Sequence, residues 1–123
     1  MIRLLLPAAF AAGLGLILLM KDRPRDAVLA FRIAAKLEPA NVQFRQNLAV
    51  ALEAAGERQE AAELLEQILA GDPSLEVARH LLARIYGGMG QKDRRRATLE
   101  RYLEFQPRSL VARELLSNPA LLR

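Results

Sequence analysis

The sequence contains no cysteine and no tryptophan, and its only histidine is His80. Without cysteine the chain has no disulfide, no thiolate zinc site, no iron–sulfur ligand and no cysteine nucleophile. A single imidazole excludes a histidine cluster for a transition metal, and a serine–histidine–aspartate triad would have to use that one residue. The sequence therefore predicts no catalytic residue, no metal site and no cofactor, and we expect a protein that is not an enzyme.

Aromatic residues are also scarce, at 5% of the 123 residues, whereas apolar residues make up 52%. A β-sandwich needs many β-branched and aromatic side chains, so this composition favours helices built from leucine and alanine. The length allows one compact domain at most. We therefore expect an all-α protein.

The excess of basic residues is small, with 18 lysines and arginines against 14 acids, for a net charge of +4. The charges separate along the chain, because residues 53–76 are mainly acidic and residues 79–108 mainly basic. Arg94, Arg95 and Arg96 form the densest basic run, and no aromatic residue lies between them to stack on bases. We interpret this run as a solvated helix start, and nucleic acid is not an expected partner.

The chain begins with an apolar segment, Leu4 to Met20, in which 17 consecutive residues carry no charged or strongly polar side chain. As a helix it would reach roughly 25 Å, the short end of what crosses a hydrocarbon core. We predict a membrane anchor over residues 1–21. A buried or partner-covered helix and a cleaved signal peptide are the alternatives, and the charged Lys21 directly after the run speaks against cleavage.

Basic residues flank this segment mainly on its carboxyl side. By the positive-inside rule, a single-pass protein of this kind, most simply in a bacterial inner membrane, would keep its body in the cytoplasm. Long domains are translocated largely regardless of charge, so a periplasmic body is the alternative. The basic residues concerned are Lys21, Arg23, Arg25, Arg32 and Lys36.

One internal period of 34 residues relates Pro39, Pro73 and Pro107, and the same shift relates Gly56 and Gly90. Within each unit the apolar residues recur at helical spacing in two stretches, so each unit is predicted to be a helical hairpin. A glycine in the left-handed conformation ends a helix and lets the chain reverse. Proline cannot continue the helical ladder and stops the second helix.

Polar residues follow each proline and are predicted to start the next helix. They are Asn41, Ser74 and Ser109, whose side chains can accept hydrogen bonds from free backbone N–H groups. The last helix is expected over residues 110–117, ended by Asn118 and Pro119.

These residues together resemble the tetratricopeptide repeat (TPR) family. In the unit 42–75 the residues at the family's positions are Leu48, Ala49, Leu52, Gly56, Ala61, Leu65 and Pro73. In the unit 76–109 they are Leu82, Ala83, Tyr86, Gly90, Arg95, Leu99 and Pro107, so Arg95 replaces a small residue and looser packing is expected there. The resemblance implies a right-handed α-solenoid of helical hairpins, preceded by the apolar, transmembrane helix.

The resemblance also implies a division of the chain. After the anchor at residues 1–21, the TPR domain spans residues 22–123. It comprises the second half of repeat 1 (22–41), repeat 2 (42–75), repeat 3 (76–109) and a capping helix with a tail (110–123). Leu14, Gly15 and Leu18 also fall at the family's register, so the apolar segment could instead be the first arm of repeat 1.

Family members hold extended peptides against the first helix of each repeat. Carried over to this sequence, the groove positions predict partner contacts at Gln43, Gln46, Asn47, Val50, His80, Leu81, Arg84 and Glu114, with Val77 and Val111 at further groove positions. Asn47 matches one position of the clamp by which some members grip an acidic chaperone tail. Val77 and Leu81 stand where that clamp has basic residues, which argues against this ligand.

The predicted function is a membrane-tethered protein-interaction module, a scaffold or assembly factor that binds partner proteins on the concave face of its repeats. The alternative is an integral structural subunit whose apolar helix packs against other transmembrane helices. The small residues between Pro7 and Gly15 favour close helix packing in lipid. The sequence names neither the partner nor the oligomeric state.

Overall fold

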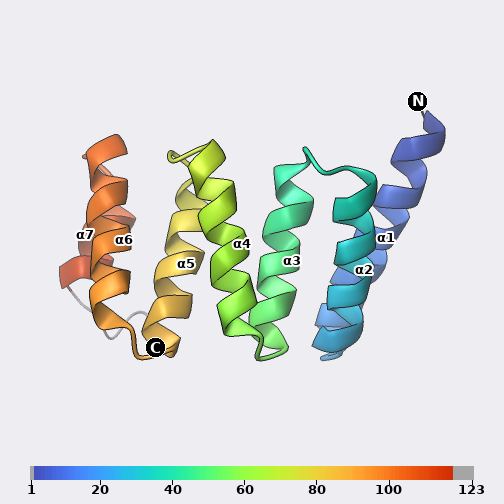
Figure 1. Ribbon diagram of the computed structural model, residues 1–123, viewed down its shortest axis with the longest axis horizontal. Helices are drawn as coiled ribbons and strands as arrows, with labels where there is room; N and C mark the ends of the chain where they lie inside the picture. Colours follow the sequence, from blue (N-terminus) through green and yellow to red (C-terminus); the bar gives the residue numbers. More distant parts are fainter. Residues whose placement is uncertain (1, 118–123) are drawn as a thin grey trace. The chain divides into compact units, whose positions relative to one another are not determined.

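The computed structural model describes the backbone of residues 2–117, and the side chains of residues 7–117 other than residue 105 (Figure 1). Over this range the chain forms helices and no strand, which confirms the expected all-α class. The helices are α1 (Ile2–Met20), α2 (Pro24–Leu37), α3 (Val42–Ala54), α4 (Arg58–Gly71), α5 (Glu76–Gly88), α6 (Lys92–Phe105) and α7 (Leu110–Ser117).

The helices group into two compact units, Met1–Ala61 and Ala62–Arg123. In the first unit α1 packs against α2, and α2 packs against α3 (Figure 1). In the second unit α5 packs against α6, and α6 packs against α7. Within each unit these helices therefore pack against their neighbours in the sequence, as expected of helical hairpins.

The hairpins close through one kind of turn, repeated every 34 residues. The residue with positive φ is Asp22 (57°) in the first turn, Gly56 (85°) in the second and Gly90 (76°) in the third. The next residue donates its backbone N–H over 2.8 Å to a carbonyl in the last turn of the preceding helix: Arg23 to Leu18, Glu57 to Leu52 and Gln91 to Tyr86. The predicted glycine turns are confirmed, and Asp22 takes the glycine position in the first hairpin.

Helix α1 is the first arm of that hairpin. Ala8, Ala12 and Gly15 are buried, and a Cβ atom on Gly15 would lie 2.7 Å from the Phe31 ring of α2. The small residues that we expected to serve helix packing in lipid thus let α1 approach α2 within the chain. This packing agrees with the alternative given above, in which the apolar segment is the first arm of repeat 1.

None of the helices in the described part of the chain meets the length and apolarity that crossing a membrane requires. The transmembrane anchor predicted over Leu4 to Met20 is therefore not supported.

The predicted helix starts are correct at two of three positions. The Asn41 Oδ1 atom accepts from the Phe44 N–H at 3.2 Å, and Ser109 Oγ accepts from the Ala112 N–H at 3.2 Å. The prediction for Ser74 is wrong: Leu75 precedes α5 as its N-cap and offers no capping side chain.

Ser74 instead stabilises the turn before α5. Its backbone N–H and its Oγ donate to Asp72 Oδ1 at 3.1 and 2.6 Å, and these hydrogen bonds lower the pKa of the Asp72 carboxyl. The predicted helix-ending residues Asn118 and Pro119 lie outside the described residues.

Apolar side chains of the repeat pattern form the core of each unit. In the first unit Phe31, Leu48 and Leu52 are buried with the small residues of α2. In the second unit Leu99, Tyr102 and Leu115 pack in one cluster with Ala83 and Ala112. The faces of α5, α6 and α7 that are not buried in this core remain available to ligands.

Candidate functional site

The predicted groove positions in the first unit lie on α3 and differ in exposure. The Gln43 Nε2 atom donates to Asn47 Oδ1 over 3.2 Å, so these two amides orient each other at the surface. Val50 is half-buried, whereas Gln46 is buried. Gln43, Asn47 and Val50 therefore remain candidate contacts, and Gln46 has little surface to offer a partner.

In the second unit the structure brings two of the predicted helices together. His80 of α5 and Val111 of α7 line the same small cleft, with a volume of about 10 Å³. Such a volume holds a single water at most. Arg84 is half-buried and Glu114 is exposed, whereas Leu81 is buried in the core.

In the second unit, large apolar side chains are exposed on α5 and α7, the two helices that carry predicted groove positions. Val77 on α5 is 67% exposed, and Leu110 and Val111 on α7 are also exposed. Among the described residues of this unit, the large exposed apolar side chains lie on α5 and α7. An extended peptide with apolar side chains could bury them.

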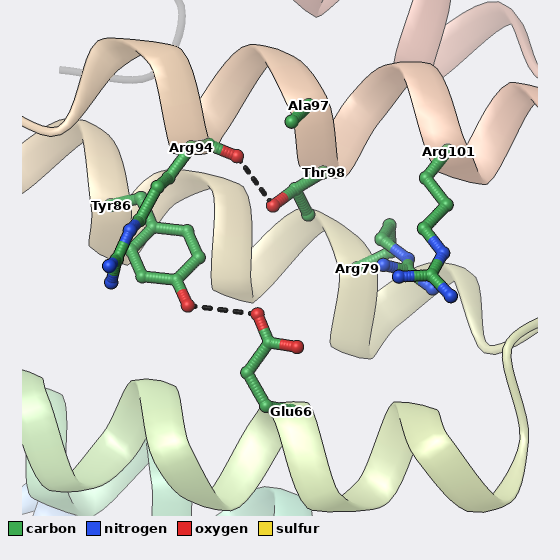
Figure 2. Close-up of a pocket in the computed structure, with 7 residues that line it drawn as sticks. All are labelled: Glu66, Arg79, Tyr86, Arg94, Ala97, Thr98 and Arg101. Carbon is green, nitrogen blue, oxygen red and sulfur yellow. Dashed lines mark hydrogen bonds between the residues drawn. The ribbon is translucent and has the colours of Figure 1, made fainter.

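A much larger cavity, of about 290 Å³, is lined by residues of α4, α5 and α6 (Figure 2). Helix α5 contributes two buried side chains, Arg79 and Tyr86, and α6 a third, Thr98. We call this cavity the arginine pocket; it is lined by Glu66, Arg79, Tyr86, Arg94, Ala97, Thr98 and Arg101.

Hydrogen bonds and an aromatic contact organise one end of the arginine pocket. The Tyr86 hydroxyl donates to Glu66 Oε1 over 2.8 Å, which ties α5 to α4. The Arg94 guanidinium carbon lies 5.8 Å from the centroid of the Tyr86 ring. The Thr98 hydroxyl donates over 2.7 Å to the Arg94 carbonyl within α6 (Figure 2).

The electrostatics of the pocket follow from burial and neighbouring charges. Burial, followed by the hydrogen bond to the negative Glu66, raises the pKa of Tyr86 to about 12. Arg79 is only 5% exposed, and burial together with the positive Arg101 lowers the pKa of its guanidinium. Its Nε is buried without a hydrogen-bond partner. The pocket therefore holds a concentrated positive charge.

In the part of the chain that the structure describes, no three histidine or carboxylate side chains lie close enough together to hold a metal ion. The pocket contains a single carboxylate, Glu66, beside three arginines. This arrangement repels cations and attracts oxyanions.

The tetratricopeptide repeat family matches residues 18–74 and residues 53–118. The chain belongs to this family. TPR domains bind protein partners and are generally interaction scaffolds and not enzymes. No curated protein matches the chain in sequence.

A solved structure described as the crystal structure of MamA has the same fold, with a TM-score of 0.76 at 20% identity. The match covers 89% of this chain and 64% of the MamA chain. The chain thus spans less than two thirds of the protein to which it is similar, and at this identity the likeness concerns the fold alone.

Our sequence interpretation of the TPR chain missed the arginine pocket. It treated Arg94 as part of a solvated run and gave Glu66 no role of its own, although both line the pocket. A signal was present in the spacing. Arg94 and Arg101 are seven residues apart on α6, and so are Arg79 and Tyr86 on α5, which places each pair on one face of its helix.

Proposed function

We propose that this TPR chain is a protein-interaction module that binds an extended segment of a partner protein on its first helices. The observation that carries the proposal is the exposed apolar surface of α5 and α7. Val77 and Val111 stand at the family's groove positions, and His80 lies beside Val111 in the same cleft. Such side chains become buried when an apolar residue of a partner binds between them.

The remaining predicted contacts are polar and would set specificity. Asn47 and Gln43 offer amide groups on α3, and Arg84 and Glu114 offer charges on α5 and α7. Hydrogen bonds from such groups orient a bound peptide, while the apolar anchors supply most of the affinity.

Site-directed photo-crosslinking in the native cell tests this proposal. A photoreactive residue at Val77 or Val111 is expected to form adducts with a partner protein. The control position is Glu100, which is exposed on α6, where it pairs with Arg96 over 3.6 Å. Equal yields of the same adducts from Glu100 would contradict binding on the first helices.

As a second candidate, we propose that the chain is a structural subunit whose first hairpin packs against transmembrane helices of a larger complex. One observation favours it: Phe10 and Met20 of α1 are 75% and 85% exposed, and Leu29 and Ile33 of α2 are exposed as well. Large apolar side chains gathered on one hairpin favour burial against an apolar partner. A membrane-tethered module would use the same surface.

Fractionation of native cells tests this second candidate. The wild-type chain is expected in the membrane fraction, and Phe10→Ser combined with Ile17→Ser is expected to release it. Ala9→Ser, a change at an exposed position of α1, should leave the distribution unaltered. Recovery of the wild-type chain outside the membrane fraction would exclude this role.

A further inference from the structure

The arginine pocket contains two neighbouring guanidinium groups, with the carboxylate of Glu66 as the one negative charge that lines the pocket with them. Arg79 comes from α5 and Arg101 from α6, and Arg101 is close enough to lower the pKa of Arg79 (Figure 2). Among the described residues, no ion pair joins either of them to a carboxylate. Two like charges at one cavity repel each other, and an anion bound between them offsets this repulsion.

Arg79 makes this arrangement unusual for a protein surface. The residue is 5% exposed, and its Nε has no hydrogen-bond partner. Arginine is fully buried in proteins almost only when it is paired, because it stays charged and loses its hydration. Arg101, in contrast, is exposed at the rim, so a ligand can reach the pocket past it.

Glu66 is the one acid in the pocket, and it is already engaged. Its Oε1 accepts from the Tyr86 hydroxyl over 2.8 Å, and Tyr86 in turn lies under the Arg94 guanidinium. Three guanidinium groups and one carboxylate give the pocket lining an excess of two positive charges. A bound dianion would balance this excess.

We propose that the arginine pocket binds a phosphate monoester, with the phosphoryl oxygens held by Arg79 and Arg101. A phosphate monoester carries about −1.5 to −2 charges at pH 7 and three strong acceptor oxygens, which matches the excess of two positive charges. A single carboxylate would neutralise only half of this excess. Guanidinium groups hold phosphate through pairs of parallel N–H donors.

The cavity volume of about 290 Å³ also leaves room for the group that carries the phosphate. Two sources share this chemistry: a phosphorylated side chain of a partner protein and a small free phosphate compound. Arg79 lines both this pocket and the small cleft with His80 and Val111, whereas Arg101 lines the pocket and not that cleft. A variant of Arg101 therefore tests the pocket separately from the proposed peptide groove.

Binding to the full chain can be measured by calorimetry with three probes. They are inorganic phosphate, a short and otherwise uncharged peptide with one phosphoserine, and the same peptide with glutamate in place of phosphoserine. We expect saturable binding of a phosphate probe and weaker binding of the glutamate peptide. Tighter binding of the phosphopeptide than of phosphate identifies a protein source, and the reverse identifies a small phosphate compound.

The matched variants are Arg101→Gln and Arg96→Gln. Both remove one charge from α6, but Arg101 lines the pocket whereas Arg96 pairs with Glu100 at the surface. Loss of a charged hydrogen bond is expected to weaken phosphate binding about tenfold or more in Arg101→Gln, and Arg96→Gln should bind like the wild type. Arg101 is exposed and repels Arg79, so its removal should leave the fold intact.

Three results would overturn the proposal. They are the absence of saturable binding for both phosphate probes, equal weakening by Arg96→Gln and Arg101→Gln, and equal affinity for the glutamate peptide. The Arg79 Nε–H resonance gives an independent readout, since it should shift on addition of phosphate to the wild type and require a higher phosphate concentration for the same shift in Arg101→Gln.

Discussion

The two units of the chain share one hairpin design but present different chemistry on equivalent positions. Ile33 in α2 and Arg101 in α6 lie two repeat periods apart, and both are exposed. Ala30 and Thr98 are related by the same shift, and both are buried. The inward positions are therefore constrained by size, whereas an outward position can hold an apolar side chain in one unit and a guanidinium in the other.

This difference separates the candidate roles of the two units. The first unit exposes apolar side chains on α1 and α2, which suits an apolar partner surface. The second unit exposes charge on α6, and within the residues described its exposed large apolar side chains lie on α5 and α7. Four predictions test the comparison.

The largest effect is expected from the core of the first unit. Phe31 is completely buried, and Phe31→Ala should lower the free energy of unfolding by about 3–5 kcal/mol. The control is Phe10→Ala on the exposed face of α1, which should change it by less than about 0.5 kcal/mol. Urea unfolding followed by circular dichroism measures both. A comparable loss for Phe10→Ala would show that the outer face of α1 is packed.

The contact between α1 and α2 can be tested with two glycines of α1. Gly15→Ala places a methyl group against the Phe31 ring and should cost about 1–3 kcal/mol through overpacking, partly offset by the better helix propensity of alanine. Gly13 has open space around it, so Gly13→Ala should stabilise by up to about 1 kcal/mol. Thermal denaturation gives the sign of each effect. Stabilisation by both changes would refute the close α1–α2 packing.

In the second unit the hydrogen bond between Tyr86 and Glu66 should be worth about 1–2 kcal/mol, so Tyr86→Phe should destabilise by that amount. The pH dependence has a definite sign. The pKa of Tyr86 is raised from 10.0 to about 12 in the folded chain. The folded state therefore retains a proton that the unfolded state loses, and the stabilisation is complete below pH 10 and lost as the pH rises through 12.

Denaturation of wild type and Tyr86→Phe across this pH window measures the effect, and the gap between the two should narrow at high pH. The variant keeps Tyr102, whose pKa is raised by burial and by Glu76, so the comparison isolates Tyr86. A constant gap from neutral to alkaline pH would contradict the role given to this hydroxyl.

The smallest effect is expected at the turns. Asp22 adopts the left-handed conformation that glycine adopts at positions 56 and 90. Asp22→Gly should relieve roughly 1 kcal/mol of backbone strain, partly offset by the greater freedom of glycine in the unfolded chain. A net gain of about 0.5 kcal/mol is expected, and Gly56→Asp should have the opposite sign. Equal signs in thermal denaturation would show that the turns are not equivalent.

Much of the fold could be predicted from the sequence because local rules governed it. Pro39, Pro73 and Pro107 stop helices, and Gly56 and Gly90 reverse the chain, for reasons that lie in their own backbone geometry. The role of Asp22 was harder to predict, since aspartate tolerates the left-handed conformation without requiring it. Ser74 is not the cap because α5 begins one residue later, after Leu75, and the Ser74 hydroxyl donates to Asp72 instead.

The apolar segment shows where sequence reasoning reached its limit. Hydropathy alone favoured a membrane anchor over Leu4 to Met20, and the same small residues fit packing against α2 equally well. The deciding fact is a tertiary contact, that of Gly15 with the Phe31 ring. Composition cannot distinguish lipid from a neighbouring helix, because both are apolar surroundings.

The candidate sites divide in the same way. The groove positions are predictions from the repeat register, and they stay predictions. Val77 among them is exposed, whereas the burial of Leu81 and Gln46 depends on packing. The arginine pocket was missed because its members are spread over α4, α5 and α6, and no stretch of sequence contains them all.

The sequence by itself determined the helices, their turns and the 34-residue period, because these depend on backbone propensities and on spacing along one chain. The tertiary structure alone decided that α1 completes the first hairpin and that Arg79, Arg94 and Arg101 surround one cavity. Burial and charge neighbourhood arise only when separate helices meet, and these two quantities give a side chain its chemical function.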